Sequence, residues 1–163
     1  MVTDQSLLER ARAAAASVTD PELPPLTIED LGILRDVRMD NGTIEISITP
    51  TYSGCPATRE IADAIQRAVI GAGVEKFRIR HVLTPAWTTE WLTAAAHQKL
   101  TDLGIAPPEA GVATDILFGR THLVCPLCKS ANTEQISAFG STACKALHRC
   151  LACREPFEAF KCH

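Results

Sequence analysis

The chain has 163 residues, of which 46% are hydrophobic and 21% are charged, and its formal net charge is −3. This length allows one ordinary domain and one smaller domain. The charge excludes the strong positive field on which nonspecific nucleic-acid binding depends. No apolar run approaches the roughly 18 residues of a membrane span, and the N-terminus lacks the features of an export signal. We therefore expect a cytoplasmic protein with no membrane or nucleic-acid partner.

The first part of the chain predicts a helix followed by a β-hairpin. Apolar residues recur at helical spacing from Leu7 to Val18, and the proline-rich segment 20–25 ends this helix. Segments 33–39 and 43–49 read as strands, because the second of them alternates between isoleucine and polar residues. Asn41-Gly42 between them is typical of a tight hairpin turn.

The next part of the chain predicts a crossover. A helix is expected from about Pro56 to Gly71, and a strand from Phe77 to Leu83. Because strands joined by a crossover helix lie parallel, this strand should pair parallel with the preceding one. His81 alternates onto its apolar face, so we expect this histidine in the core. A last helix is expected at about 89–103.

Together these elements predict an α+β fold class. It consists of a small two-layer α-β-β-α-β-α domain with a three-stranded mixed sheet. A small all-β zinc ribbon follows, which the pairs Cys125-x-x-Cys128 and Cys150-x-x-Cys153 indicate. The boundaries that we expect are 1–105 for the first domain, 106–120 for a linker that contains proline and glycine, and 121–163 for the ribbon. Six of the seven cysteines lie in this last segment.

Two Cys-x-x-Cys pairs predict a metal centre in the ribbon. Each pair places two thiolates on one tight turn, and two such turns supply the four soft ligands of a tetrahedral site. The odd number of cysteines and the expected reducing compartment argue against a disulfide framework. We therefore expect a structural Zn²⁺, although spacing alone leaves iron or an iron–sulfur cluster open. The four ligands would be Cys125, Cys128, Cys150 and Cys153.

Other ribbon residues could replace or supplement these ligands, namely Cys144, His148, Cys162 and His163. Four thiolates complete a metal site, so Cys144 is left over. It precedes Lys145, and a neighbouring lysine favours the thiolate form. Cys144 is therefore a candidate for a transient iron or cluster ligand.

Cys55 is the cysteine that lies outside the ribbon. It lies between a glycine and a proline where a helix begins, and the positive end of the helix dipole favours the thiolate, which binds metals and attacks electrophiles. Alternatively, Cys55 is a small apolar residue that packs the loop. Thr51 and its hydroxyl-bearing neighbours suggest a polar rim, and Asp20 and Glu22 are either surface carboxylates or further ligands.

Several segments resemble known families. Asp20-Pro21-Glu22, residues 28–33 and residues 51–56 resemble the iron–sulfur assembly domain of SufT-like proteins. The C-terminal run from Phe139 to Leu147, continued from Cys150 to the end, resembles the PaaD (PaaJ) family. Members of that family are accessory subunits of the bacterial phenylacetyl-CoA 1,2-epoxidase system. The resemblance covers essentially the whole chain.

This resemblance implies an accessory factor of aerobic phenylacetate degradation with no catalytic activity of its own. Such a factor would assist the assembly or repair of an iron or iron–sulfur centre. Its partners would be the oxygenase or reductase components, and a homodimer is left open. By the same resemblance, Cys55 matches the hallmark cysteine of the assembly domain, and Asp20 and Glu22 match its acidic loop.

Three other functions are left open by the residues. The ribbon could hold redox-active iron, which would make the chain a small electron carrier of the same system. It could bind nucleic acid, although the near-neutral charge argues against this function. A thiol enzyme built on Cys55 would need a base, and only His81 could approach it through the fold.

Overall fold

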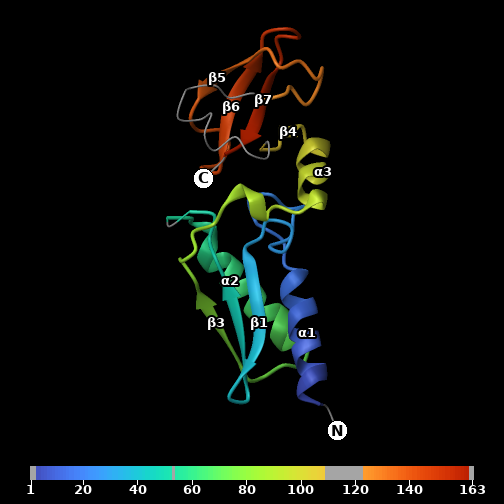
Figure 1. The fold of residues 1–163 in the computed structure, drawn as a ribbon, viewed down its shortest axis with the longest axis vertical. Helices are drawn as coiled ribbons and strands as arrows, with labels where there is room; N and C mark the ends of the chain where they lie inside the picture. The colour runs from blue at the N-terminus through green and yellow to red at the C-terminus, as the bar shows by residue number, and fades with distance from the viewer. Residues whose placement is uncertain (1–2, 53, 109–122, 162–163) are drawn as a thin grey trace. The chain divides into compact units, whose positions relative to one another are not determined.

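The computed structural model describes residues 3–52, 54–108 and 123–161. The chain divides into two units, residues 1–87 with 91–93 and residues 88–90 with 94–163, and each is described by itself (Figure 1). Ser53, Cys162 and His163 lie outside the described residues, as does the expected linker from residue 109 onward.

The first unit is built on a three-stranded sheet. Its strands β1 (Leu34–Asp40), β2 (Thr43–Ile48) and β3 (Phe77–His81) lie in the order β1-β2-β3. The first pair is antiparallel and the second is parallel, so the predicted mixed sheet is confirmed. Asn41 and Gly42, with φ of 48° and 75°, form the hairpin turn, because a two-residue turn of this type needs positive φ at both positions.

Two helices cover the apolar face of this sheet (Figure 1). Helix α1 (Asp4–Ala16) begins after Thr3, whose hydroxyl accepts a hydrogen bond from the backbone N–H of Ser6 at 3.2 Å. Helix α2 (Ala57–Gly71) follows the loop that carries Cys55. The buried side chains of helices and sheet form one core, which includes Ala11, Ala15, Val37, Ile44, Ile46, Ile48, Ile61, Ile65 and Val69.

The expected last helix is interrupted. A short 3-10 helix η1 (Thr89–Trp91) precedes helix α3 (Ala94–Asp102). The interruption has a tertiary cause, because the backbone N–H of Thr93 donates to the carbonyl of Asp30 at 3.0 Å. The prediction of a continuous helix was therefore wrong.

The prediction that His81 lies in the core was also wrong. This residue ends β3 and is exposed. β3 lies at the edge of the sheet, so no strand of the described residues covers its outer side.

The second unit contains α3 and a four-stranded sheet in the order β4-β7-β6-β5. Three antiparallel strands form the ribbon: β5 (Thr133–Ser137), β6 (Lys145–Cys150) and β7 (Pro156–Phe160). The short strand β4 (Ile105–Ala106) pairs parallel with β7. This pairing adds Ile105 and Ala106, which lie at the expected boundary, to the sheet of the second unit.

None of the helices in the described residues is both long and apolar enough to span a membrane.

Candidate functional site

The four predicted metal ligands come together in the ribbon. The Sγ atoms of Cys125, Cys128, Cys150 and Cys153 all lie within 4.8 Å of one another. The Sγ atoms of Cys125 and Cys153 are 3.8 Å apart, and those of Cys128 and Cys150 are 3.5 Å apart. A tetrahedral ion with metal–sulfur bonds of about 2.3 Å requires sulfur atoms about 3.8 Å apart. The donor set and its spacing therefore fit a structural metal ion.

Two similar turns position these thiols. In the first turn, the N–H of Lys129 donates to the carbonyl of Cys125 at 3.0 Å, and the N–H of Cys125 donates to the carbonyl of Ser130 at 2.9 Å. In the second turn, the N–H of Cys150 donates to the carbonyl of Glu155 at 3.0 Å. The residue after each pair is left-handed, with φ of 62° at Lys129 and 66° at Arg154. This conformation folds each loop back so that both of its thiols face one point.

The electrostatics of the cluster favour a thiolate before any metal arrives. The backbone N–H of Cys153 points at the sulfur of Cys150, and this hydrogen bond lowers the pKa of Cys150 to about 6. For Cys153, the N–H of Glu155 lowers the pKa, but burial and the shared hydrogen bonds of the neighbouring thiols outweigh it and raise the pKa to about 12. Cys150 therefore loses its proton more readily than Cys153, and a divalent ion would displace the protons that remain.

Cys144 lies apart from this cluster. It is buried, and its sulfur is 3.1 Å from the hydroxyl oxygen of Thr142. Lys145, which the sequence suggested as its activating neighbour, forms an ion pair with Glu158 at 2.9 Å. His148 is also buried and stacks on Phe157. Neither Cys144 nor His148 belongs to the four-thiol group.

Cys55 lies on a turn immediately before α2. It is half-buried, its N–H donates to the carbonyl of Tyr52 at 3.1 Å, and its carbonyl accepts from the N–H of Thr58 at 3.2 Å. Thr51 is buried, as is Thr49, whose hydroxyl has no hydrogen-bond partner within the described residues. The two threonines therefore point inward and do not form the polar rim that the sequence suggested.

Asp20 organises the acidic loop. Its Oδ1 atom accepts hydrogen bonds from the backbone N–H groups of Glu22 at 2.8 Å and Leu23 at 3.0 Å. Burial raises the pKa of Asp20, these two hydrogen bonds lower it, and the charges of Glu22 and Glu60 raise it further. Glu60 is in the first turn of α2. The charge of Glu60 therefore couples Asp20 in the acidic loop to α2, the helix that begins just after Cys55.

Within residues 3–52, 54–108 and 123–161, the four ribbon thiols are the one group of three or more His, Cys, Asp or Glu side chains that lies at metal-binding distances. Cys55, Asp20 and Glu22 are not assembled into a ligand set. Sequence reasoning missed Glu60, which its position in the first helical turn after Cys55 could have indicated.

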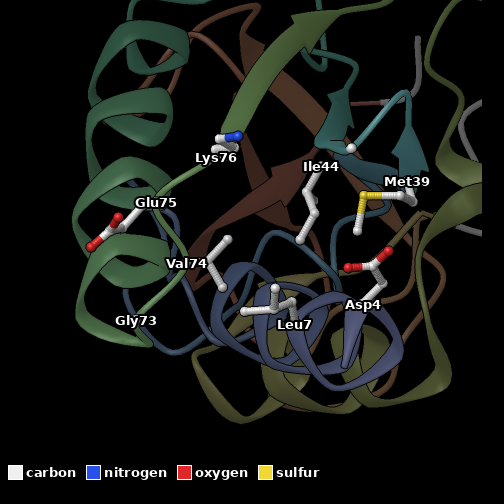
Figure 2. Close-up of a pocket in the computed structure, with 9 residues that line it drawn as sticks. Asp4, Leu7, Met39, Ile44, Gly73, Val74, Glu75 and Lys76 are labelled. Atoms are coloured by element: carbon white, nitrogen blue, oxygen red, sulfur yellow. The ribbon is translucent and has the colours of Figure 1, made fainter. Parts of the chain in front are cut away.

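A pocket at the other end of β2 holds no group of metal ligands among the described residues (Figure 2). It has a volume of about 360 Å³ and lies where α1, the hairpin turn and the loop before β3 meet. Leu7, Ile44 and Val74 supply apolar walls, and Asp4 and Met39 lie at one side (Figure 2). No cysteine or histidine lines it.

Most of the chain is similar to a known protein. It is 48% identical, over 151 residues, to a protein of Escherichia coli (strain K12) that is named as one of the subunits of 1,2-phenylacetyl-CoA epoxidase. The match covers 92% of this chain and 90% of the relative. Residues 109–161 match the PaaD zinc beta ribbon domain, and residues 8–78 match the iron–sulfur cluster assembly protein family. The chain belongs to the PaaD family.

Two further relatives are similar to the first unit. The Fe-S protein maturation auxiliary factor YitW of Bacillus subtilis (strain 168) is 33% identical over 95 residues, which cover 57% of this chain and 92% of that protein. A crystal structure of a domain of unknown function, DUF59, from Bacillus anthracis superposes with a TM-score of 0.52 at 27% identity. It covers 59% of this chain and 92% of the other, so the α+β fold of the first unit is confirmed.

Proposed function

We propose that this PaaD-family chain is a maturation factor of phenylacetyl-CoA epoxidase that assists the assembly or repair of an iron or iron–sulfur centre. The relatives support this role, because one is named as an epoxidase subunit and another as an Fe-S protein maturation factor. The observation that carries the proposal is the half-buried thiol of Cys55 just before α2, whose first turn holds Glu60, a carboxylate that acts on Asp20 of the acidic loop. A thiol and carboxylates are a mixed donor set that binds ferrous iron.

In this proposal, iron or a cluster is the cargo and Cys55 is its attachment point. Glu60 and the acidic loop would attract the cation, because the negative charges of Glu22 and Glu60 both act on Asp20 and add together. Asp20 would keep the loop in shape through its two backbone hydrogen bonds. Cys55 and these carboxylates do not form a complete ligand set. An incomplete set suits a carrier, because a cargo that must be passed on has to leave easily.

The ribbon would hold Zn²⁺ through its four thiolates and would contact the oxygenase or reductase component. Zinc has no redox chemistry, and a closed four-thiolate site keeps no open position. Its contribution would therefore be to the stability of the second unit. The groups that orient the ligands are the backbone N–H and carbonyl groups of the two turns.

Complementation of a deletion strain tests the proposal. Cys55→Ser should fail to restore epoxidase activity, because serine does not supply a soft thiolate. Cys144→Ser is the matched control, since it changes a thiol that lies outside the metal cluster, and it should restore activity. Full activity of the Cys55→Ser strain would eliminate the proposed role of this thiol, and failure of Cys144→Ser alone would move the cargo site to the ribbon.

Four thiolates at these distances would also accommodate a single iron ion. The chain would then be an electron carrier. Such a protein would be coloured, and its visible absorption would bleach on reduction. A colourless chain with bound zinc would exclude this second function.

A further inference from the structure

Strand β3 leaves one edge of the sheet open. It pairs with β2, and no strand of the described residues pairs with its other edge. The opposite edge is partly covered, because Arg12 donates to the carbonyl of Val37 at 3.0 Å and pairs with Asp36 at 3.4 Å. Open edges present unpaired backbone N–H and carbonyl groups to any other extended chain. β3 is therefore the edge at which another chain could add a strand.

The register shows which residues of β3 face this edge. The N–H of Ile44 donates to the carbonyl of Lys76 at 3.0 Å, and the N–H of Val82 donates to the carbonyl of Ile48 at 2.8 Å. Even-numbered residues of the strand thus direct their backbone groups toward β2. Because this direction alternates along a strand paired in parallel, the residues that face the open edge are Phe77, Ile79 and His81.

The outer face of the sheet beside this edge carries more positive than negative charge. Arg38, Arg78 and Arg80 surround the buried carboxylate of Glu45, at 2.6, 2.7 and 3.5 Å. Arg78 also pairs with Asp40. The hydrogen bond from Arg78, the largest of these effects, lowers the pKa of Glu45, so this carboxylate is charged at neutral pH. Three guanidinium groups therefore face two carboxylates.

The guanidinium group of Arg80 has N–H donors that its contact with Glu45 does not use. Its closest contact with Glu45 is 3.5 Å, at the limit of a hydrogen bond, and 58% of its side chain is exposed. A guanidinium group carries five N–H donors. Arg80 can therefore bind a second carboxylate without breaking the interactions of Arg78 with Glu45.

The charges of Arg78 and Arg80 indicate which kind of chain can pair with the open edge of β3. If two copies of β3 paired antiparallel about Ile79, Arg78 of each copy would lie opposite Arg80 of the other, on the same face. Like charges directly opposite each other destabilise a pair of strands, and opposite charges stabilise it. A second copy is thus disfavoured, and an acidic strand is favoured.

We propose that the open edge of β3 binds an extended segment of a partner protein in which acidic and apolar side chains alternate. Its acidic side chains lie over Arg78 and Arg80 on the outer face. Its apolar side chains lie beside Phe77 and Ile79, which are half-buried. Its backbone pairs with the N–H and carbonyl groups of Ile79 and His81. The proposed strand pairing uses no contact of Cys55, and it does not depend on the maturation role.

Nuclear magnetic resonance of the full chain tests this surface with synthetic peptides. The probe is a short peptide of alternating glutamate and valine, and its counterpart replaces every glutamate by lysine. The glutamate peptide should shift the amide signals of Ile79 and His81, and the lysine peptide should not. Equal binding of both peptides, or binding of neither, would overturn the proposal.

Two pairs of variants separate charge from backbone pairing. Arg80→Glu should weaken the glutamate peptide roughly tenfold, because an attractive cross-strand pair becomes a repulsive one. Arg67→Glu, the same change at an exposed position of α2, should leave the affinity unchanged. His81→Pro removes an N–H that faces the edge and should weaken binding, whereas His81→Ala should not.

Each contrary result has a definite meaning. Equal effects of Arg80→Glu and Arg67→Glu would show a general charge effect and no site. A wild-type dimer that His81→Pro dissociates would make a second copy the occupant and contradict the acidic partner. If His81→Pro does not fold, Arg80→Glu decides alone, because Arg80 is mostly exposed and makes one weak contact.

Discussion

Replacing Gly32 by alanine probes the contact that fixes Trp91. Gly32 has a φ of +66°, and a Cβ atom added to it would lie 2.6 Å from both the Cβ and the carbonyl oxygen of Trp91. Trp91 in turn lies under the guanidinium group of Arg35, at 3.4 Å from the ring centre. Because the neighbouring atoms include backbone, they cannot rotate out of the way. The substitution must therefore shift the segment that interrupts the last predicted helix.

The expected cost has two parts. A left-handed conformation costs a residue with a Cβ atom about 1–2 kcal/mol. Forcing an extra atom into a packed contact costs about 1–3 kcal/mol more. We therefore expect Gly32→Ala to lower the free energy of unfolding of the first unit by about 2–5 kcal/mol. For a unit of this size, each kcal/mol corresponds to about 4–8 °C in Tm.

Gly42→Ala is the matched control. Gly42 has a similar φ of +75°, but nothing lies within 4 Å of the position that its Cβ atom would occupy. It should show the conformational cost alone, about 1–2 kcal/mol. Urea unfolding followed by tryptophan fluorescence measures both variants. Equal destabilisation by the two substitutions would refute the argument from the close approach of Trp91.

Two further predictions concern a buried carboxylate and the metal cluster. Asp20→Asn keeps an oxygen that can accept both backbone hydrogen bonds and removes a charge whose burial raises the pKa of Asp20 above its ordinary 3.8. Because the folded pKa of Asp20 is raised, wild-type stability falls as pH rises from 3.8 through the folded value. Urea unfolding should therefore find the variant at least as stable as wild type at neutral pH, and the difference should vanish in acid. A higher stability of the variant in acid alone would contradict this direction. Cys150→Ser, or chelation of the metal, should abolish the cooperative unfolding of the second unit and spare that of the first, because structural zinc contributes about 10–16 kcal/mol in small domains. Differential scanning calorimetry distinguishes the two unfolding transitions. An unchanged transition of the second unit would show that the metal is not structural.

Local patterns predicted the regular elements of the first unit. The alternation of Ile44, Ile46 and Ile48 and the Asn41-Gly42 turn specify a hairpin without reference to the rest of the chain. The parallel pairing of β3 followed from the handedness of crossover connections. The four-thiol cluster was predictable for a similar reason, because each Cys-x-x-Cys pair forms its own turn.

Features that depend on distant residues were not predictable. The break in the last helix arises from contacts of Trp91 and Thr93 with Gly32 and Asp30, which lie about sixty residues earlier. The exposure of His81 depends on which strand lies at the edge of the sheet. The interaction of Glu60 with Asp20 likewise depends on the fold, since no sequence motif relates the two residues.

Ferrous iron binding to the zinc-loaded chain, measured without oxygen, tests the maturation role most directly. The protein is incubated with ferrous iron, desalted, and analysed for zinc, iron and acid-labile sulfide, alongside the Cys55→Ser and Cys144→Ser variants. We expect one zinc per chain in all three proteins. We expect iron in wild type and Cys144→Ser and its loss in Cys55→Ser. Equal iron in wild type and Cys55→Ser, or iron that replaces the ribbon zinc, would contradict the proposal that Cys55 carries the cargo.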